Sequence, residues 1–275
     1  MNLLLPAIVV VVTTALAVGV MLLVRRGAPE GSRFTDGDRA SGVFGVLATG
    51  FSVLLGFVVF LAFESYDQSR SGAEQEALVV SQQVETAQFL GAPVARELTG
   101  ELVCYGRSVV NLEWPRSESG DQGDSINPWG VALFQTFQTV QPRTPGQEAA
   151  YGKWLDLTTE RSAARIDRIH GAVGVIPTPL WIVLILISGV IFVFMLFFAD
   201  RAEGAVTQAV LIGSVATVIV SMLLLIRFLD DPFTDGVGGI RPVAMERTLR
   251  VIEEALQAID EGVVVPCDAR GNPVS

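Results

Sequence analysis

Four long apolar stretches dominate this chain and restrict the kind of structure that it can form. They cover residues 3–24, 43–63, 180–199 and 206–226, and none contains Asp, Glu, Lys, Arg or His. An apolar run of 18 or more residues is typical of a helix that crosses a bilayer. The sequence therefore predicts an all-α integral membrane protein with four transmembrane helices in contact with a lipid bilayer.

The segments between and after these stretches divide the chain into four regions. Residues 3–63 hold the first two spans and a short Arg-rich loop, 25–42, while residues 180–226 hold the last two spans. Residues 64–179 are polar with helical periodicity, which predicts a helical-bundle extramembrane domain between spans two and three. Residues 227–275 predict an extramembrane turn, an amphipathic helix and a loose tail.

Apolar residues at helical spacing outline the elements of the extramembrane domain. The stripe of the second span continues through residues 66–87, so we expect one long helix to leave the membrane. A second stripe covers 94–112, and Pro115 is expected to stop that helix. Shorter helices are expected over 129–140 and 151–169, with polar Gly- and Pro-containing loops between them.

Charge and composition exclude several classes of function. The net charge of −10 argues against a nucleic-acid partner, because phosphate binding needs a basic face. His170 is the only histidine, and no paired carboxylates or nucleophile motif lies near a membrane edge. We therefore expect neither an enzyme nor a cofactor. The excess of Arg over Lys is typical of a GC-rich bacterial genome. For a bacterial protein with several helical spans, we expect the cell (inner) membrane as the location.

The two cysteines, Cys104 and Cys267, lie on the same side of the membrane, because two spans separate them. They could form a disulfide if that side is oxidising. Spacing alone rarely predicts a bridge, so we favour the interpretation that they are two unrelated thiols.

The distribution of arginines predicts an orientation. Loop 25–42 is short and carries four Arg, two of which directly follow the first span. The positive-inside rule then places this loop in the cytoplasm and residues 64–179 outside it. Arg161, Arg165 and Arg168 precede the third span and would lie on the outer face, which counts against this assignment.

The second span carries a stripe of small and hydroxyl residues on one face: Gly45, Thr49, Ser52 and Gly56. In lipid such residues often mark a contact between helices, because they allow the backbones to approach closely. The alternative is that the stripe lines a water-filled path. Phenylalanines of the same span could constrict this path, namely Phe51, Phe57, Phe60 and Phe63. Since no ionisable residue lies within a span, such a path would select ions by size and hydration.

Several short motifs resemble the bestrophin anion channels. Residues 51–63, FSVLLGFVVFLAF, resemble the bestrophin pore-neck helix, and residues 229–256 resemble the segment that follows the last bestrophin span. The latter includes Pro232 and Phe233. Glu113-Trp114-Pro115 is similar to a motif of the bestrophin-like family of bacterial four-span proteins, although Trp and Pro at that place could simply pack and stop a helix.

This resemblance implies a homo-oligomer in which the second span surrounds a pore. Carried over by position, the implied pore residues are Ser52, Leu55, Phe57, Val59 and Phe60. In animal members an acidic run holds calcium. Its remnant in this chain is Asp230, Asp231 and Asp235, which favours a solvated turn over a calcium site because calcium takes six or more oxygen ligands.

Two functional hypotheses follow. The first is an oligomeric ion channel, with anions as the expected ions and the second span lining the path. The second is a non-conducting membrane scaffold or sensor that binds a protein partner through residues 64–179 or 244–260. One departure from the bestrophin pattern is that bestrophins keep the large helical portion in the cytoplasm, whereas the Arg-rich loop 25–42 predicts the reverse here.

Overall fold

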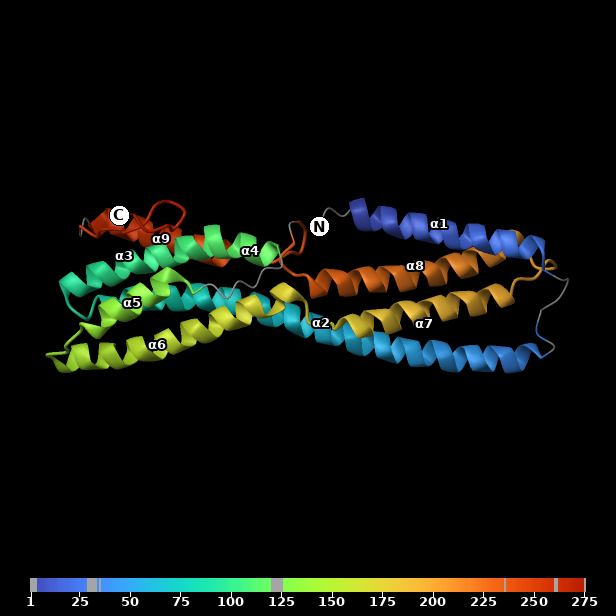
Figure 1. Ribbon diagram of the computed structural model, residues 1–275, viewed down its shortest axis with the longest axis horizontal. Coiled ribbons are helices and arrows are strands. Elements are labelled where there is room, and N and C mark those ends of the chain that lie inside the picture. Colours follow the sequence, from blue (N-terminus) through green and yellow to red (C-terminus); the bar gives the residue numbers. More distant parts are fainter. Residues whose placement is uncertain are drawn as a thin grey trace. The chain divides into compact units, whose positions relative to one another are not determined.

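A computed structural model shows an all-α chain, as the sequence predicts, and it describes residues 4–28, 34, 36–119, 126–234, 236–259 and 262–274. The α-helices within these residues follow the order in Figure 1. They are α1 (Leu4–Arg26), α2 (Gly37–Ala87), α3 (Ala92–Ser108), α4 (Trp114–Glu118), α5 (Pro128–Gln138), α6 (Pro145–His170), α7 (Thr178–Phe197), α8 (Ala205–Asp230) and α9 (Val243–Ile259).

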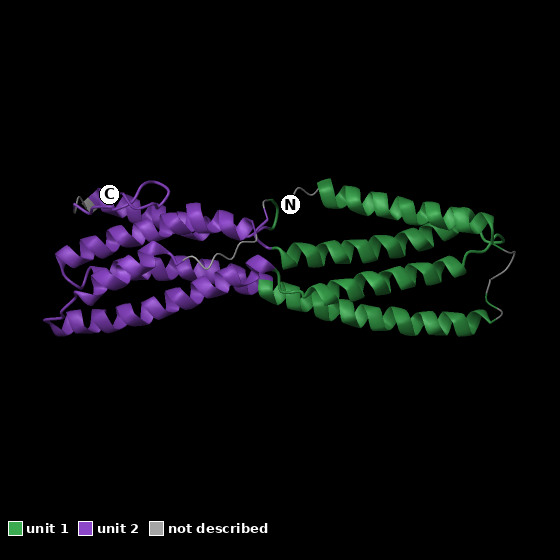
Figure 2. Ribbon diagram, viewed as in Figure 1, with its two compact units in different colours: residues 1–65, 174–231, 235–238 green, residues 66–173, 232–234, 239–275 purple. Residues whose placement is uncertain are grey.

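Four of these helices, α1, α2, α7 and α8, are long and apolar enough to cross a membrane. They correspond to the four predicted spans. The second span does continue beyond the apolar stretch, because α2 is a single helix of 51 residues. The chain separates into two units, shown in Figure 2, and α2 contributes residues to both.

Unit 1 comprises residues 1–65, 174–231 and 235–238, and it contains the four spans. One buried cluster joins α2 to α7 and α8 through Phe51, Val58, Leu184, Ile191 and Ile226. A second cluster joins α1 to α8 through Ala17, Met21 and Ile212. Between α1 and α8 the hydroxyls of Thr14 and Thr217 lie 3.0 Å apart, so this contact also includes an interhelical hydrogen bond of the kind found in membranes.

Unit 2 comprises residues 66–173, 232–234 and 239–275. The second half of α2 and helices α3, α5, α6 and α9 surround one buried apolar cluster. Side-chain caps begin two of these helices where the sequence breaks: Asn127 accepts a hydrogen bond from Trp129 N, and Thr144 accepts one from Gln147 N. Helix α9 buries Met245, Leu249 and Ile252 in the cluster.

The expectation that Pro115 stops its helix is wrong. Residues Val109–Glu113 form a π-helical segment, and α4 then begins at Trp114 with Pro115 in its first turn. Proline is tolerated in a first turn because the N–H that it lacks has no intrahelical partner there. The wider π turn therefore lets the chain continue to Glu118 as a helix.

The preferred interpretation of the cysteines is also wrong. Cys104 on α3 and Cys267 in the C-terminal segment form a disulfide, with their Cα atoms 5.7 Å apart. The segment is held further by Trp129, whose Nε1 donates to Gly271 O over 2.7 Å. Gly271 is close-packed as well, since a Cβ there would clash with the backbone N of Ser108. Residues 262–274 are therefore fixed against α3 and α5, where the sequence suggested a loose tail.

Candidate functional site

The small-residue stripe of α2 lies on an exposed face of unit 1. Gly45, Thr49, Ser52 and Gly56 are all exposed, and a Cβ built on either glycine would meet no atom within 4 Å. The Ser52 hydroxyl donates to Ala48 O over 2.9 Å, which satisfies it within its own helix. Within a single chain, therefore, no described helix packs against this stripe.

The remaining predicted pore residues divide between two faces of α2. Phe57 and Phe60 are 65% and 62% exposed, whereas Leu55 and Val59 are half-buried against the α2–α7 cluster. Phe60 follows Gly56 by four positions and so extends the stripe, while Phe57 is turned away from Gly56 by about 100°. The structure therefore groups Phe60 with the stripe and separates it from Leu55 and Val59.

The predicted family-motif residues come together in unit 2. Trp114 is buried and its ring packs edge-on against Phe233, with ring centroids 5.5 Å apart. Its Nε1 donates to Ile240 O over 3.4 Å, and Ile240 N donates to Pro232 O over 2.8 Å. Trp114 thereby links two segments that are more than 100 residues apart in the sequence.

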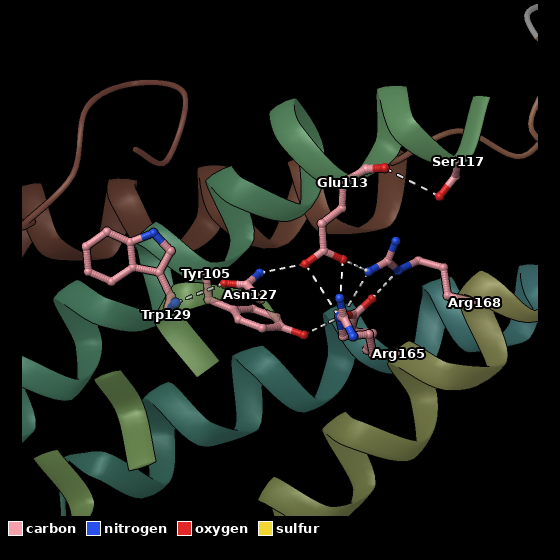
Figure 3. Close-up of polar contacts among 8 residues, drawn as sticks. Tyr105, Glu113, Ser117, Asn127, Trp129, Arg165 and Arg168 are labelled. Atoms are coloured by element: carbon pink, nitrogen blue, oxygen red, sulfur yellow. Dashed lines mark hydrogen bonds and ion pairs between the residues drawn. The ribbon is translucent and has the colours of Figure 1, made fainter. Parts of the chain in front are cut away.

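Glu113 belongs to a buried ion network, which Figure 3 shows. Arg168 on α6 donates through Nη2 to Glu113 Oε2 over 2.6 Å and through Nε to Glu76 Oε2 over 2.5 Å. Arg165 Nε lies 3.2 Å from Glu113 Oε2, and Asn127 Nδ2 donates to Glu113 Oε1 over 2.8 Å. Helices α2 and α6 and the π segment are therefore joined by two carboxylates and two guanidinium groups.

A second layer of aromatic and polar groups completes the network. The Tyr105 hydroxyl donates to Glu76 Oε1 over 2.5 Å, and the guanidinium of Arg161 lies 4.7 Å from the centre of the Tyr105 ring. Arg161 also donates to Gln83 Oε1 over 2.8 Å. The guanidinium of Arg168 lies 5.5 Å from the Trp114 ring, which links the network to the family-motif residues by a cation–π contact.

The charges in the network perturb one another. Burial by itself would raise the pKa of Glu113, but Arg168 and Arg165 outweigh it and hold this pKa below its ordinary value. Burial, reinforced by the nearby Glu76 carboxylate, raises the pKa of Tyr105 well above its ordinary value. At neutral pH Glu113 is therefore charged and Tyr105 is neutral, as their hydrogen bonds require.

Gly72 explains how α2 and α6 come close enough for these contacts. A Cβ on Gly72 would lie 2.5 Å from Arg168 N and 2.9 Å from Ala164 O, both of them backbone atoms. Only glycine permits this approach, because a Cβ cannot fit and the backbone of α6 cannot give way cheaply.

Sequence reasoning treated Arg161, Arg165 and Arg168 only as charges next to the membrane. The sequence does hold a signal for the network, because Glu76 and Gln83 interrupt an apolar helical stripe at core positions. Arg161, Arg165 and Arg168 also share one face of a helix, at spacings of four and three. A buried acid paired with a distant arginine is the arrangement that these two patterns favour together.

The acidic turn after α8 uses its first carboxylate to hold the chain. Asp230 Oδ1 accepts hydrogen bonds from Val175 N and Ile176 N, at 2.8 and 2.9 Å, and Asp231 pairs with Arg227. Asp235 lies outside the described residues. Among the residues that are described, no group of three or more His, Cys, Asp or Glu side chains could hold a metal ion. The solvated turn that the sequence favours here stays a prediction, and calcium binding stays the less favoured alternative.

A family model and several solved structures match this chain. A family model described as the Bestrophin-like domain matches residues 11–245. The structure of a bacterial bestrophin homologue from Klebsiella pneumoniae superposes with a TM-score of 0.65 at 15% identity, covering 92% of this chain and 99% of that one. A single-substitution variant of that homologue gives a TM-score of 0.65 at 14% identity with the same coverage. No curated protein matches the sequence.

Proposed function

This chain belongs to the bestrophin-like family, and we propose that several copies of it assemble in the bilayer into an ion channel, with the exposed face of α2 lining the path. The path would pass anions. The observation that carries the proposal is the exposed stripe Gly45, Thr49, Ser52 and Gly56, which no described part of unit 1 covers. A second copy or a water-filled path would suit this face better than lipid, because small and hydroxyl residues gather where another backbone or water approaches a span.

The chemistry of the stripe suits a pore. Hydroxyls and exposed backbone offer weak hydrogen bonds to a hydrated ion, and Phe60 adds an apolar constriction of the kind that gates by dewetting. No ionisable side chain lies within the four apolar stretches. Conduction would therefore be passive, with selection by ion size and hydration instead of coupling to a proton or a cation.

We also infer that residues 64–179 lie outside the cytoplasm. The Cys104–Cys267 disulfide belongs to an oxidising compartment, and the Arg-rich loop 25–42 is favoured in the cytoplasm. The arginines that counted against this orientation have another role, because Arg161 and Arg168 are buried in the network of unit 2. The disulfide and the loop are independent of each other and support the same orientation.

Labelling of single introduced cysteines tests this orientation. Gln141→Cys in unit 2 and Asp38→Cys at the start of α2 are both at exposed positions, and the native cysteines are already paired. In intact cells a membrane-impermeant maleimide should label Gln141→Cys, and it should reach Asp38→Cys only after lysis. The reverse pattern would place unit 2 in the cytoplasm.

Halide flux through the purified protein in liposomes tests conduction itself. Chloride or iodide efflux above that of protein-free vesicles is the expected result. Absence of flux from correctly assembled protein would favour the scaffold hypothesis. A partner of α9 would then have to meet its charged face, because Met245, Leu249 and Ile252 are already buried within unit 2.

A further inference from the structure

Unit 1 contains a pocket of about 430 Å³ between the start of α2, the end of α7 and the first half of α8. Its walls are mainly apolar and include Phe44 and Phe198. Its polar groups come from Ser41, Glu203, Gln208 and Ser214. A volume of this size, with apolar walls and few polar groups, is typical of a site for a small amphiphilic molecule.

The pocket runs from the level of the membrane surface into the span. Glu203 lies just before α8 begins at Ala205, whereas Val215, which lines the other part of the pocket, is ten residues further along the helix. Ten residues of α-helix correspond to about 15 Å, a depth that reaches the hydrocarbon of a bilayer. Polar groups near the surface and apolar walls at depth match a lipid molecule.

One hydrogen-bond acceptor beside the polar end of the pocket has no donor. Gln208 is 4% exposed, and its Nε2 donates to Asp200 O over 2.9 Å and to Glu203 Oε2 over 3.1 Å. Its Oε1 is buried and has no hydrogen-bond partner among the described residues. A buried acceptor without a partner is costly, so a group that brings donors to this place would be favoured.

The nearby cation does not fill this role. Arg25 directs its guanidinium to the backbone oxygens of Asp200, Arg201 and Glu203, at 2.6 to 3.2 Å, and so holds the loop between α7 and α8. The described residues form no salt bridge with the Glu203 carboxylate. The polar end therefore offers the exposed Glu203 carboxylate, beside a buried amide oxygen that has no donor, and such a negative end complements an ammonium group.

We propose that this pocket binds an aminophospholipid of the phosphatidylethanolamine type. The ammonium group would donate to the Glu203 carboxylate, and an acyl chain would lie between Phe44, Phe198 and the aliphatic side chains of α8. The lipid would come from the leaflet that faces loop 25–42. This site is independent of conduction, so it stands whether or not the protein is a channel.

Native mass spectrometry of the full-length protein tests the proposal, with phosphatidylethanolamine and phosphatidylglycerol of identical acyl chains as probes. Retention of the ethanolamine lipid at an about tenfold lower concentration is expected, because one charge-assisted hydrogen bond accounts for such a factor. Glu203→Gln should abolish this preference, and Ser214→Trp should remove the bound lipid by filling the pocket. Val218→Trp is the control, because Val218 lies on the same helix, is 57% exposed and does not line the pocket.

Three results would overturn the assignment, provided that the variants keep wild-type helical content and elution volume. The first is equal retention of both lipids by the wild type. The second is binding of soluble phosphoethanolamine as tight as that of the lipid, which would point to the head group alone. The third is that Ser214→Trp changes the number of associated chains and leaves lipid retention unchanged, which would show a second copy in the pocket.

Discussion

Arg168 and Glu76 form an ion pair in which neither side chain has any solvent exposure, with Nε and Oε2 2.5 Å apart. Arg168 also pairs with Glu113, so its guanidinium bridges two buried carboxylates, and Arg165 supplies the second positive charge. Such a pair gives little net stability relative to an apolar core, but the loss of one member leaves the other buried and uncompensated.

Replacement of Arg168 by Met should therefore destabilise unit 2 by about 3–5 kcal/mol. Chemical unfolding followed by tryptophan fluorescence measures this change, because Trp114 lies beside Arg168. Arg70→Met is the matched control. Arg70 pairs with Glu74 on the surface, with both side chains at least 60% exposed, so its loss should cost less than about 1 kcal/mol. Equal effects of the two substitutions would contradict the role given to the network.

The stability of unit 2 should fall in acid because of Glu113. Its pKa is below the ordinary value in the folded state, so the unfolded state takes up a proton first as the pH falls. The stabilisation is fully present above the ordinary carboxyl pKa of about 4.5 and disappears as the pH falls through the lowered pKa. Unfolding free energies measured between pH 7 and pH 3 should show a smaller slope in Glu113→Gln than in the wild type. Identical slopes would exclude this contribution.

Gly72→Ala should separate α2 from α6. The added Cβ would meet the backbone of Arg168 and Ala164, and overpacking of this kind costs about 1–3 kcal/mol. Gly152→Ala on α6 is the control, since a Cβ there meets nothing within 4 Å and should stabilise the helix by up to about 1 kcal/mol. Thermal unfolding of both variants distinguishes the two effects by their opposite signs.

Reduction of the disulfide should loosen the C-terminal segment. Cys104 and Cys267 are 163 residues apart, and removal of a native bridge typically costs about 2–5 kcal/mol. Cys267→Ala should match reduced wild-type protein in unfolding midpoint and should not respond further to reductant. Limited proteolysis should then cut within residues 262–274. A wild-type midpoint that is insensitive to reductant would show that Trp129 and Gly271 hold the segment unaided.

The spans and most helix ends could be predicted from the sequence because they depend on local patterns. An apolar run of 20 residues has few alternatives, and Asn127-Pro128 marks the start of α5 close to the expected residue 129. Helix α6 is an exception, because Thr144 caps it and it begins at Pro145, before the expected start at residue 151. The long α2 was also predictable, since the apolar stripe continues past Phe63 without a break.

The network and the disulfide depend on contacts between distant residues, and these were missed. Glu76 and Arg168 are 92 positions apart, and nothing local shows that they meet. The same holds for Cys104 and Cys267, which become neighbours only when the C-terminal segment lies along α3. The expectation that Pro115 ends its helix was wrong for a different reason. A π-helical turn places this proline in the first turn of α4, where a helix tolerates it.

The α2 stripe could be predicted in part. Its residues could be assigned to one face by spacing alone, and the structure leaves that face exposed in the single chain. What it meets in the assembled protein depends on other copies, so the assignment of the path remains our proposal.

The measurement that tests the channel proposal most directly is halide efflux from liposomes with Phe60→Ala and Leu61→Ala compared side by side. The two residues lie at the same depth of α2 and are 62% and 49% exposed, but only Phe60 extends the stripe. We expect Phe60→Ala to change the flux or its halide selectivity, while Leu61→Ala behaves as the wild type. Equal flux from all three proteins would contradict the assignment of this face of α2 to the path.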